Sequence, residues 1–388
     1  MTGARPPRPC EPRSLDIKKA ERLVREILAG AGVTVGGSAS WDITVHDPRF
    51  YPRLLQQASL GLGESYMDGW WDTPALEDFI DKILRANLKN TLKGNWRMWA
   101  LPVRAAVANL QSKARAYEVA EAHYDLGNDL YQRMLDKRMV YTCGYWRDAK
   151  TLEEAQEAKL DLICRKVGLR PGMKVLDLGC GWGGFAAFAA ERYGCQVRGV
   201  SVSKEQVALA REMWKGLDVE FILGDYRDMR GSYDAVVSIG MAEHVGYKNH
   251  RTMMEVIHRC LRPEGVALVH TIANNVSRKH GIPFIEKYIF PNACAPSAAQ
   301  LGKAIEGLFV LEDLQNIGPD YYHTLMAWWR NFDAAWPELR GPKYDDRFYK
   351  MWKFYLLAAA GAARCRDGQL YHLVLTHVGR EQPDCRKI

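Results

Sequence analysis

A run of glycines after a buried apolar stretch carries the clearest chemical signal in this sequence. Residues 174 to 178 are mainly apolar but contain Asp177, and they lead into Gly179-Cys-Gly181-Trp-Gly183-Gly184 and then a helical stretch. Glycines let the backbone approach a bound molecule closely, and open α/β sheets bind ligands at the carboxyl ends of their strands. The run therefore predicts a ligand-binding turn between a strand and a helix.

The spacing of these glycines indicates which ligand the turn holds. It is Gly-x-Gly-x-Gly-Gly, which differs from the Gly-x-Gly-x-x-Gly of dinucleotide-binding folds. With an acidic residue two positions before the first glycine, it resembles class I methyltransferases, in which this turn holds the methionine part of S-adenosylmethionine. NAD binding is the weaker alternative. The resemblance implies that this cofactor is bound by Asp177, Gly179, Cys180, Gly181, Trp182 and Gly183.

The predicted second strand lacks an acidic residue that many methyltransferases use to bind the ribose hydroxyls. Its end reads Arg198-Gly-Val-Ser201-Val-Ser203. The side chains that could take over these hydrogen bonds are Ser201, Ser203 and Gln206. After the third strand, Asp225 and Tyr226 are suitably placed to hold the adenine amino group.

These residues need a doubly wound α/β sheet to position them. A capping box, Thr151 with Glu154, opens a helix that runs to Gly168. Alternating apolar segments then predict strands at 174–178, 196–201, 219–223, 235–239 and 266–272, with helices near 184–193, 204–214 and 249–261. Segments 309–314 and 370–378 would supply two final strands. The expected fold is a Rossmann-like sheet of seven strands.

Several longer strings resemble the cyclopropane-fatty-acid synthase family, and together they span roughly residues 50 to 370. Members of this family transfer a methylene from S-adenosylmethionine to cis double bonds of phospholipid acyl chains. Besides the glycine-rich turn, the strings are Gly61-Leu-Gly-Glu-Ser-Tyr-Met-Asp-Gly-Trp-Trp71, His123-Tyr-Asp-Leu-Gly-Asn-Asp129, Tyr141-Thr-Cys-Gly-Tyr-Trp146, Gly240-Met-Ala-Glu-His-Val-Gly246, His270-Thr-Ile272, Lys287-Tyr-Ile-Phe-Pro-Asn292, and Asp320-Tyr321 before Thr324-Leu-Met-Ala-Trp328. The first string resembles the long bacterial form, which carries an additional N-terminal domain.

The chemistry of such a reaction demands a base in a dry pocket. An alkene that attacks the sulfonium methyl leaves a carbocation in the acyl chain, and ring closure requires removal of a proton from the former methyl group. Water would trap the cation as an alcohol, so the pocket must exclude it. Aromatic rings are the natural lining, because their faces stabilise a cation without reacting with it.

The resemblance implies that the base is a bound bicarbonate ion, held by the backbone at Cys143, by Glu243, His270 and Tyr321, and by the backbone at Ile272. Glu243 follows the fourth predicted strand and His270 lies near the end of the fifth, so both are expected at the edge where the cofactor binds. The resemblance adds to the cofactor site Tyr141, Thr142, Val202 and Ile239.

Each of these residues also has an ordinary structural interpretation. Cys143 could be a small buried apolar residue, His270 a core histidine, and Glu243 a surface carboxylate. His123 and Tyr124 belong to a segment that could cover the active site. Some relatives carry a cysteine where this chain has Ala359, which excludes catalysis by a thiol at that place and favours the bicarbonate base.

The N-terminal part is expected to form a smaller, mainly helical domain over residues 15–110, after a disordered leader at 1–14 and before a catalytic domain at 111–388. Eight basic residues and no acidic one lie between Lys82 and Arg115, interleaved with Trp and Leu. Such a segment suits an anionic membrane surface. A solvated helix face, an inter-domain linker and an RNA-binding segment are the alternatives.

Composition agrees with a peripheral contact to a membrane. No apolar run is long enough to span a bilayer, Leu356 to Ala363 included, and the net charge of +7 favours anionic partners. The nine cysteines form no Cys-x-x-Cys pair and have no histidine at metal-ligand spacing, so they indicate reduced thiols and neither disulfides nor a metal site. We expect a cytoplasmic protein at the inner face of the membrane that acts on unsaturated phospholipid. A homodimer is one open alternative.

Three other functions compete with a ring-forming synthase. A fatty-acyl methyltransferase would give a methyl-branched or hydroxylated product through the same cation, so the outcome depends on where the base lies. A nucleic-acid or small-molecule methyltransferase would need a target-specific motif such as Asn-Pro-Pro-Tyr after the fourth strand, where Met241-Ala-Glu243-His244 stands instead. A non-catalytic membrane-binding protein would not need the glycine-rich turn.

Overall fold

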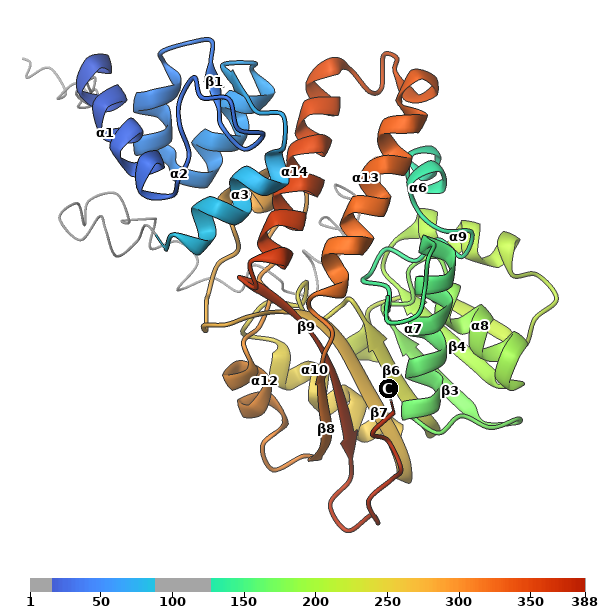
Figure 1. Ribbon diagram of the computed structural model, residues 1–388. Coiled ribbons are helices and arrows are strands. Elements are labelled where there is room, and N and C mark those ends of the chain that lie inside the picture. Colours follow the sequence, from blue (N-terminus) through green and yellow to red (C-terminus); the bar gives the residue numbers. More distant parts are fainter. Residues whose placement is uncertain (1–15, 88–126, 388) are drawn as a thin grey trace, which may run out of the picture.

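The computed structural model describes residues 16–87 and 127–387. Its centre is a seven-stranded sheet in the order β5-β4-β3-β6-β7-β9-β8 (Figure 1). Neighbouring strands are parallel from β5 to β7, and β9 is antiparallel to both β7 and β8. The strands are β3 (Lys174–Leu178), β4 (Gln196–Ser201), β5 (Val219–Leu223), β6 (Tyr233–Ile239), β7 (Leu261–Asn274), β8 (Val310–Asn316) and β9 (Gly368–Thr376).

Helices cover both faces of this sheet, because its strands carry apolar side chains on both faces that must be shielded from water. Apolar side chains of α7 (Leu152–Lys166), α8 (Gly184–Tyr193) and α9 (Lys204–Met213) pack on one face. Those of α10 (His250–Cys260) and α12 (Ala298–Ile305) pack on the other. The predicted doubly wound fold is therefore confirmed, and β3, β4, β5 and α8 have the predicted bounds.

A helical layer lies beyond the carboxyl ends of the parallel strands (Figure 1). It consists of α13 (Asp320–Leu339) and α14 (Asp346–Arg364), which connect β8 to β9, with the shorter α6 (Asn128–Met134) and α11 (Pro283–Tyr288) beside them. α13 continues through Pro337, whose ring lies in the last turn. The layer covers the sheet edge at which the glycine-rich turn, residues 179–184, lies.

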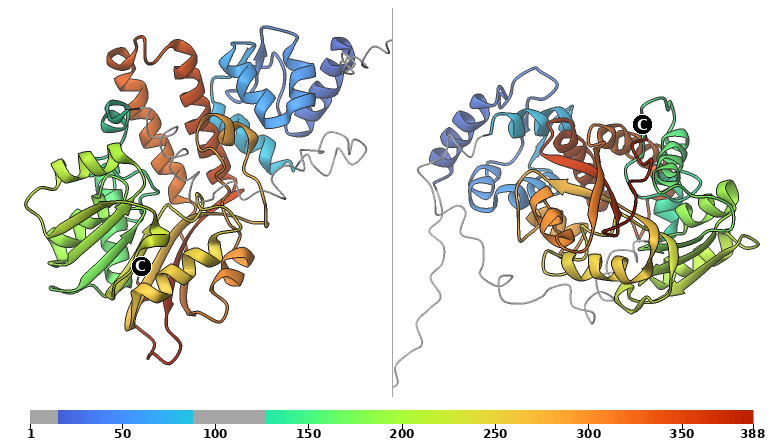
Figure 2. Two further views of the ribbon diagram at one scale, coloured as in Figure 1. Left: turned by 180° about the vertical axis from the view of Figure 1, so that it is seen from behind. Right: turned by 90° about the horizontal axis from the view of Figure 1, so that it is seen from below.

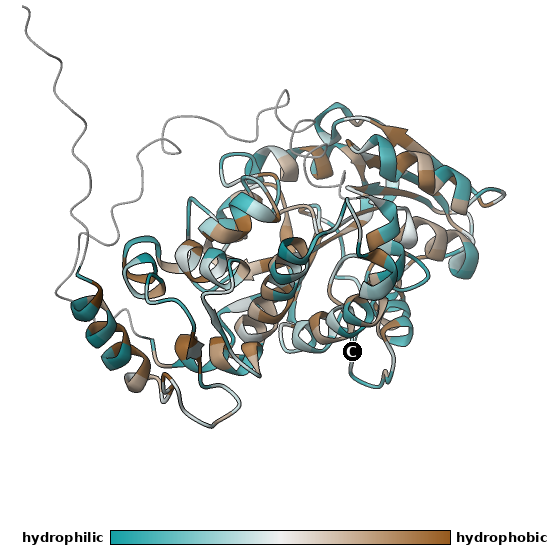
Figure 3. Cartoon of the chain, turned by 90° about the horizontal axis from the view of Figure 1, so that it is seen from above, coloured by the Kyte–Doolittle hydropathy of each residue, from teal (hydrophilic) through white to brown (hydrophobic). Residues whose placement is uncertain are grey.

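The N-terminal elements pack on α14, at the end of the molecule opposite to β3–β5 (Figures 1 and 2). They are α1 (Ile17–Gly30), β1 (Thr44–Val45), α2 (Phe50–Met67), β2 (Trp71–Asp72) and α3 (Leu76–Arg85). Their apolar side chains form one continuous cluster with those of α13 and α14. Many helices carry hydrophobic residues on one side and hydrophilic residues on the other (Figure 3).

The fold leaves some sequence predictions outside the described residues. These are the leader at 1–14, the segment with His123 and Tyr124, the domain boundary near residue 110, and most of the basic segment from Lys82 to Arg115. Two of its basic residues are described: Lys82 lies over the ring of Trp41 at 4.0 Å, and Arg85 pairs with Asp81 at 2.9 Å. In residues 16–87 and 127–387, no helix has the length and apolar character to cross a membrane.

Candidate functional site

The glycine-rich turn joins β3 to α8 and lies against the end of β4. The amides of Gly179 and Cys180 donate to the carbonyl of Val200 at 2.9 and 3.0 Å. Gly183 has a φ of +80°, and a Cβ there would lie 2.4 Å from the ring of Phe221. At Gly181, by contrast, a Cβ would meet nothing closer than 4.0 Å. The turn therefore needs its glycines and presents Gly181 to open space.

The predicted substitutes for the missing acid lie together at the end of β4. Ser201 Oγ donates to Oε1 of Gln206 at 3.0 Å, and the amide of Ser203 donates to Ser201 Oγ at 3.2 Å. Ser203 also caps α9 by accepting from the amide of Gln206 at 3.3 Å. The side-chain nitrogen Nε2 of Gln206 is the atom nearest to a Cβ placed on Gly181. Hydroxyl and amide groups thus border the turn, and half-buried Val202 lies between the two serines.

Asp225 and Tyr226 follow β5 at the same edge of the sheet. The buried carboxylate of Asp225 accepts hydrogen bonds from the backbone and guanidinium of Arg227 at 2.6 to 2.9 Å. The guanidinium lies over the ring of Tyr226 at 5.2 Å. Arg227 therefore fixes the carboxylate, and the adenine contact stays a prediction.

Two other residues predicted to bind the cofactor connect the turn region to the helical layer. Trp182 Nε1 donates to Asn128 in α6 at 2.9 Å. The hydroxyl of Tyr141 lies 2.9 Å from that of Tyr355 in α14. Asp177 is buried in β3, and among the described residues one of its carboxylate oxygens has no hydrogen-bond partner. Burial raises its pKa to about 7.

Cys143, Ile272 and Tyr321 meet in one apolar cluster with Ile317 and Leu370. Burial raises the pKa of the Cys143 thiol well above its usual range, so the sulfur stays protonated. Its Sγ donates to the carbonyl of Gly144 at 3.1 Å. Only the backbone at Cys143 is thus suited to a role in the chemistry.

Glu243 reaches this cluster from the turn after β6. Thr271 Oγ1 donates to Oε2 of Glu243 at 2.7 Å, and the amide of Ile272 lies 3.4 Å from Oε1. Burial raises the pKa of Glu243 to about 7. The carboxyl group can therefore be protonated near neutral pH, when it can donate a hydrogen bond as well as accept one.

His270 lies in β7 opposite the last residue of β6, Ile239. Its Nδ1 lies 2.8 Å from Nε2 of His372, its register partner in β9. Its Nε2 is buried and has no hydrogen-bond partner among the described residues. Burial lowers the pKa of His270 well below its usual range, so the ring is neutral. An unsatisfied buried ring nitrogen of this kind is costly unless something binds it.

Aromatic rings pack against Tyr321, which shares a cluster with Cys143 and Ile272. The ring of Tyr321 stands perpendicular to that of Trp328 at 6.0 Å, and Tyr141 lies 5.0 Å from Trp328. Phe290 lies 6.1 Å from both Tyr141 and Tyr355. Burial raises the pKa of the Tyr321 hydroxyl well above its usual range, so it keeps its proton. Ala359 stands one turn after Tyr355 on α14 and provides no nucleophile.

The structure adds three residues that the sequence analysis missed. Thr271 binds Glu243, His372 binds His270, and Lys159 donates from α7 to the hydroxyl of Thr142 at 2.9 Å. Thr271 and His372 lie in strands. The alternation of polar and apolar residues along a strand predicts which side chains are buried, but it does not predict their hydrogen-bond partners. Lys159 is a charged residue in a helix, which a sequence pattern assigns to the solvent.

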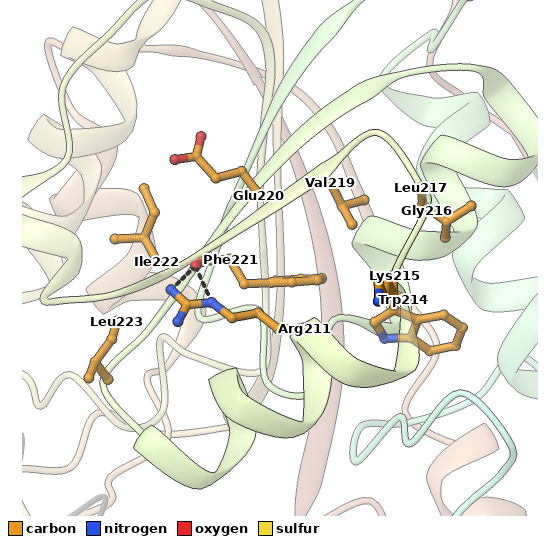
Figure 4. Close-up of a pocket in the computed structure, with 10 residues that line it drawn as sticks. All are labelled: Arg211, Trp214, Lys215, Gly216, Leu217, Val219, Glu220, Phe221, Ile222 and Leu223. Carbon is orange, nitrogen blue, oxygen red and sulfur yellow. Dashed lines mark hydrogen bonds between the residues drawn. The ribbon is translucent and has the colours of Figure 1, made fainter.

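A hollow at the outer edge of the sheet contains none of the predicted site residues (Figure 4). It lies between α9 and the edge strand β5. Arg211 extends into it and donates to the carbonyl of Phe221 at 3.1 and 2.6 Å. The guanidinium thereby satisfies an edge-strand carbonyl, which reduces the tendency of this edge to pair with another strand.

Known proteins match the chain over most of its length. The family model "Mycolic acid cyclopropane synthetase" matches residues 111–373. The cyclopropane-fatty-acyl-phospholipid synthase of Escherichia coli K12 is 50% identical over 355 residues, which are 92% of this chain and 93% of that protein. A probable fatty acid methyltransferase of Pseudomonas putida is 32% identical over 84% of this chain and 85% of its own length.

Solved structures agree with these sequence matches. The cyclopropane synthase MmaA2 of Mycobacterium tuberculosis superposes with a TM-score of 0.62 at 31% identity, covering 67% of this chain and 97% of that structure. The mycolic acid cyclopropane synthase CmaA1, complexed with SAH and CTAB, gives a TM-score of 0.63 at 30% identity, over 67% and 97%. With its sheet order, cofactor turn and buried acid pocket, the chain belongs to the mycolic acid cyclopropane synthetase family.

Proposed function

We propose that this protein is an S-adenosylmethionine-dependent synthase that converts cis double bonds of phospholipid acyl chains into cyclopropane rings. The observation that carries the proposal is the buried group of donors and acceptors formed by Glu243, His270 and the Ile272 amide, next to the cluster that contains Tyr321. A simple methyl transfer needs no such buried polar group. Removal of a proton from the transferred carbon does.

The residues at the turn fit S-adenosylmethionine. Gly181 faces open space, Gln206 and Ser201 offer hydrogen-bonding groups for hydroxyls, and the unpartnered carboxylate oxygen of Asp177 offers an acceptor. We assign the methionine part to the turn, the ribose to Ser201, Ser203 and Gln206, and the adenine to Asp225 and Tyr226. The remaining contacts fall to Tyr141, Thr142, Trp182, Val202 and Ile239.

The acid pocket fits a small oxyanion such as bicarbonate. If His372 donates to Nδ1 of His270, the neutral His270 carries its proton on the unpartnered Nε2 and can donate it to an anion. The amide of Ile272 makes only a 3.4 Å contact with Glu243 and is available to a better acceptor. Protonated Glu243 and the Tyr321 hydroxyl are two more donors. These groups support bicarbonate as the base.

The protein's own groups then have distinct tasks. When bound, S-adenosylmethionine supplies the methyl group and bicarbonate supplies the basic oxygen. Glu243, His270 and Ile272 hold the anion at the place where a proton must leave. Tyr321 and Trp328, whose rings stand perpendicular to each other, would line the acyl chain, where aromatic rings stabilise positive charge and exclude water.

A peripheral contact with an anionic membrane completes the proposal. After β7, the segment 275–282 exposes Val276 (58%) and Ile282 (42%) with Arg278, Lys279 and His280 between them. Apolar side chains mixed with cations suit the boundary between headgroups and acyl chains. The same strand carries His270 and Ile272, so this segment would bring the pocket to the lipid. The N-terminal lipid-binding domain, the inner-face location and a homodimer stay predictions.

The test is a lipid assay with S-adenosylmethionine that carries a radiolabelled methyl group. Vesicles of cis-unsaturated phosphatidylglycerol and an equal mass of tRNA are offered together. We expect label in the lipid, loss of vinyl protons and new ring protons in the NMR spectrum. A methyl-branched lipid without a ring would favour the fatty acid methyltransferases among the relatives. Label in the tRNA with none in the lipid would refute the proposal.

A further inference from the structure

Lys159 is a fully buried lysine. Within the described residues, the only hydrogen bond of its side chain goes to a residue of the predicted site. Its side chain has no solvent exposure, and its Nζ donates to Thr142 Oγ1 at 2.9 Å. A buried ammonium costs free energy unless it is paired and hydrogen-bonded, and a neutral hydroxyl compensates little of that cost. Some other benefit must therefore maintain a charge here.

Two buried carboxyl groups lie within electrostatic reach of Lys159, one of them on the cofactor strand β3. Burial lowers the pKa of Lys159 to about 8, while Asp136 and Asp177 act to raise it. Its charge in turn contributes to the lowered pKa of His270. Lys159 thus lies within electrostatic reach of the cofactor strand and of the base pocket.

Thr142 connects this lysine to the turn that carries Glu243. A Cβ on Gly240 would lie 2.5 Å from Cγ2 of Thr142, so the threonine packs directly on this glycine. The Gly240 amide donates to the carbonyl of His270 at 2.9 Å. Gln156, one turn before Lys159 on α7, donates to the carbonyl of Thr142 at 2.7 Å. One side of α7 therefore holds Thr142 by both its hydroxyl and its backbone.

We propose that Lys159 is a positioning residue, which fixes Thr142 and thereby sets the backbone of Tyr141–Cys143 against the Gly240–Glu243 turn. The consequence is a defined distance between the transferred methyl carbon and the base. The inference rests on the proposed function, because it concerns the same reaction.

A second buried lysine on the same helix shows what a purely structural lysine looks like. Lys166 is 1% exposed and forms an ion pair with the carboxylate of Asp313. Its Nζ also donates to the carbonyl of Cys385 at 3.4 Å. Neither partner belongs to the site. Lys166 therefore provides a matched control for Lys159, with the same residue type, helix and burial.

The test compares Lys159→Met, Lys159→Gln and Thr142→Val with Lys166→Met in the vesicle assay. A shift of about 1 Å in a reacting group can cost about 100-fold in rate, so we expect a loss of this order in kcat for K159M and T142V. We also expect alcohol or alkene by-products in place of part of the ring product. In K159M, affinity for S-adenosylhomocysteine, measured by calorimetry, should change less than kcat. K159Q, which can still donate to Thr142, should recover part of the loss.

K166M should lose thermal stability and keep the wild-type kcat and ring fraction. The double variant T142V/K159M should be no slower than the slower of the two single variants, because both substitutions remove the same Lys159–Thr142 hydrogen bond. Wild-type kcat and ring fraction in K159M, or additive losses in the double variant, would overturn the proposal. If K159M does not fold, T142V decides, since it keeps the lysine and the shape of residue 142. If the wild-type protein leaves lipid unmodified, the proposed function fails instead.

Discussion

Replacing Glu243 by glutamine separates the chemistry of the site from its contribution to folding. Glutamine keeps the shape of the side chain and one carbonyl oxygen for the Thr271 hydroxyl. It cannot share a proton with a bound anion as a carboxyl group with a pKa of about 7 can. We expect kcat to fall by about 100-fold or more, which is within the range for a group that supports general base catalysis. Affinity for S-adenosylhomocysteine should be nearly unchanged.

The same substitution should change stability in a pH-dependent way. Burial raises the pKa of Glu243 from 4.5 to about 7. Between these values the unfolded chain has released a proton that the folded chain still holds, so this carboxyl lowers the free energy of unfolding as pH rises through the window. At about 1.36 kcal/mol per pKa unit, the loss is about 3 kcal/mol by the upper end of the window. Glutamine does not titrate and escapes it.

Urea unfolding at several pH values measures this difference. The unfolding free energy of Glu243→Gln relative to wild type should rise by about 3 kcal/mol from about pH 4.5 to about pH 8, whatever constant offset the altered hydrogen bonds add. Glu312→Gln is the control for activity, because Glu312 is also buried but lies in β8 and binds Thr376. A pH-independent difference, or full activity of the Glu243 variant, would refute the reasoning.

Three further substitutions probe other parts of the account. Gly183→Ala places a Cβ 2.4 Å from the ring of Phe221 at a φ of +80°; calorimetry should show affinity for S-adenosylhomocysteine reduced by more than about 10-fold, and unchanged affinity would contradict the assigned turn. His372→Phe removes the partner of His270 Nδ1; kcat should fall by about 10-fold with cofactor affinity retained, and a wild-type kcat would show that the pair does not orient His270. Val276→Ser exposes less apolar surface to lipid; vesicle sedimentation should show binding weaker by about 10-fold, the equivalent of one valine side chain, and equal binding would exclude this segment from the membrane contact.

The sheet could be predicted from the sequence because its strands are buried on both faces. Continuous apolar segments separated by amphipathic helices have few alternative readings, and β3, β4 and β5 have the predicted bounds. β6 and β7 begin earlier than predicted, at Tyr233 and Leu261. Polar residues follow both positions, and the pairing shifts register before it resumes at Ala235 and Val266. Helices α13 and α14 were not predicted from the sequence, because adjacent aromatic residues such as Tyr321-Tyr322 and Trp328-Trp329 blur the helical periodicity.

The proposed base site could be predicted only in part. The strings identified Glu243 and His270, and parallel strands bring their carboxyl ends to one edge. The partners of these groups depend on pairing between distant segments, such as β7 with β9, which places His372 beside His270. The periodicity of apolar residues does not predict the pairing register of strands that lie so far apart in the sequence. Lys159 was missed because a lysine on a helix is usually solvated, and only the packed structure shows where its ammonium lies.

The most direct test of the central claim uses S-adenosylmethionine with a fully deuterated methyl group, in ordinary water, with vesicles of cis-unsaturated phospholipid. If the buried pocket removes a proton from the transferred carbon, the lipid gains a CD2 unit, loses its vinyl protons and shows a ring in the NMR spectrum. The Glu243→Gln variant should give little of this product. A product that retains all three deuterium atoms as a CD3 branch, in wild-type protein, would contradict the account.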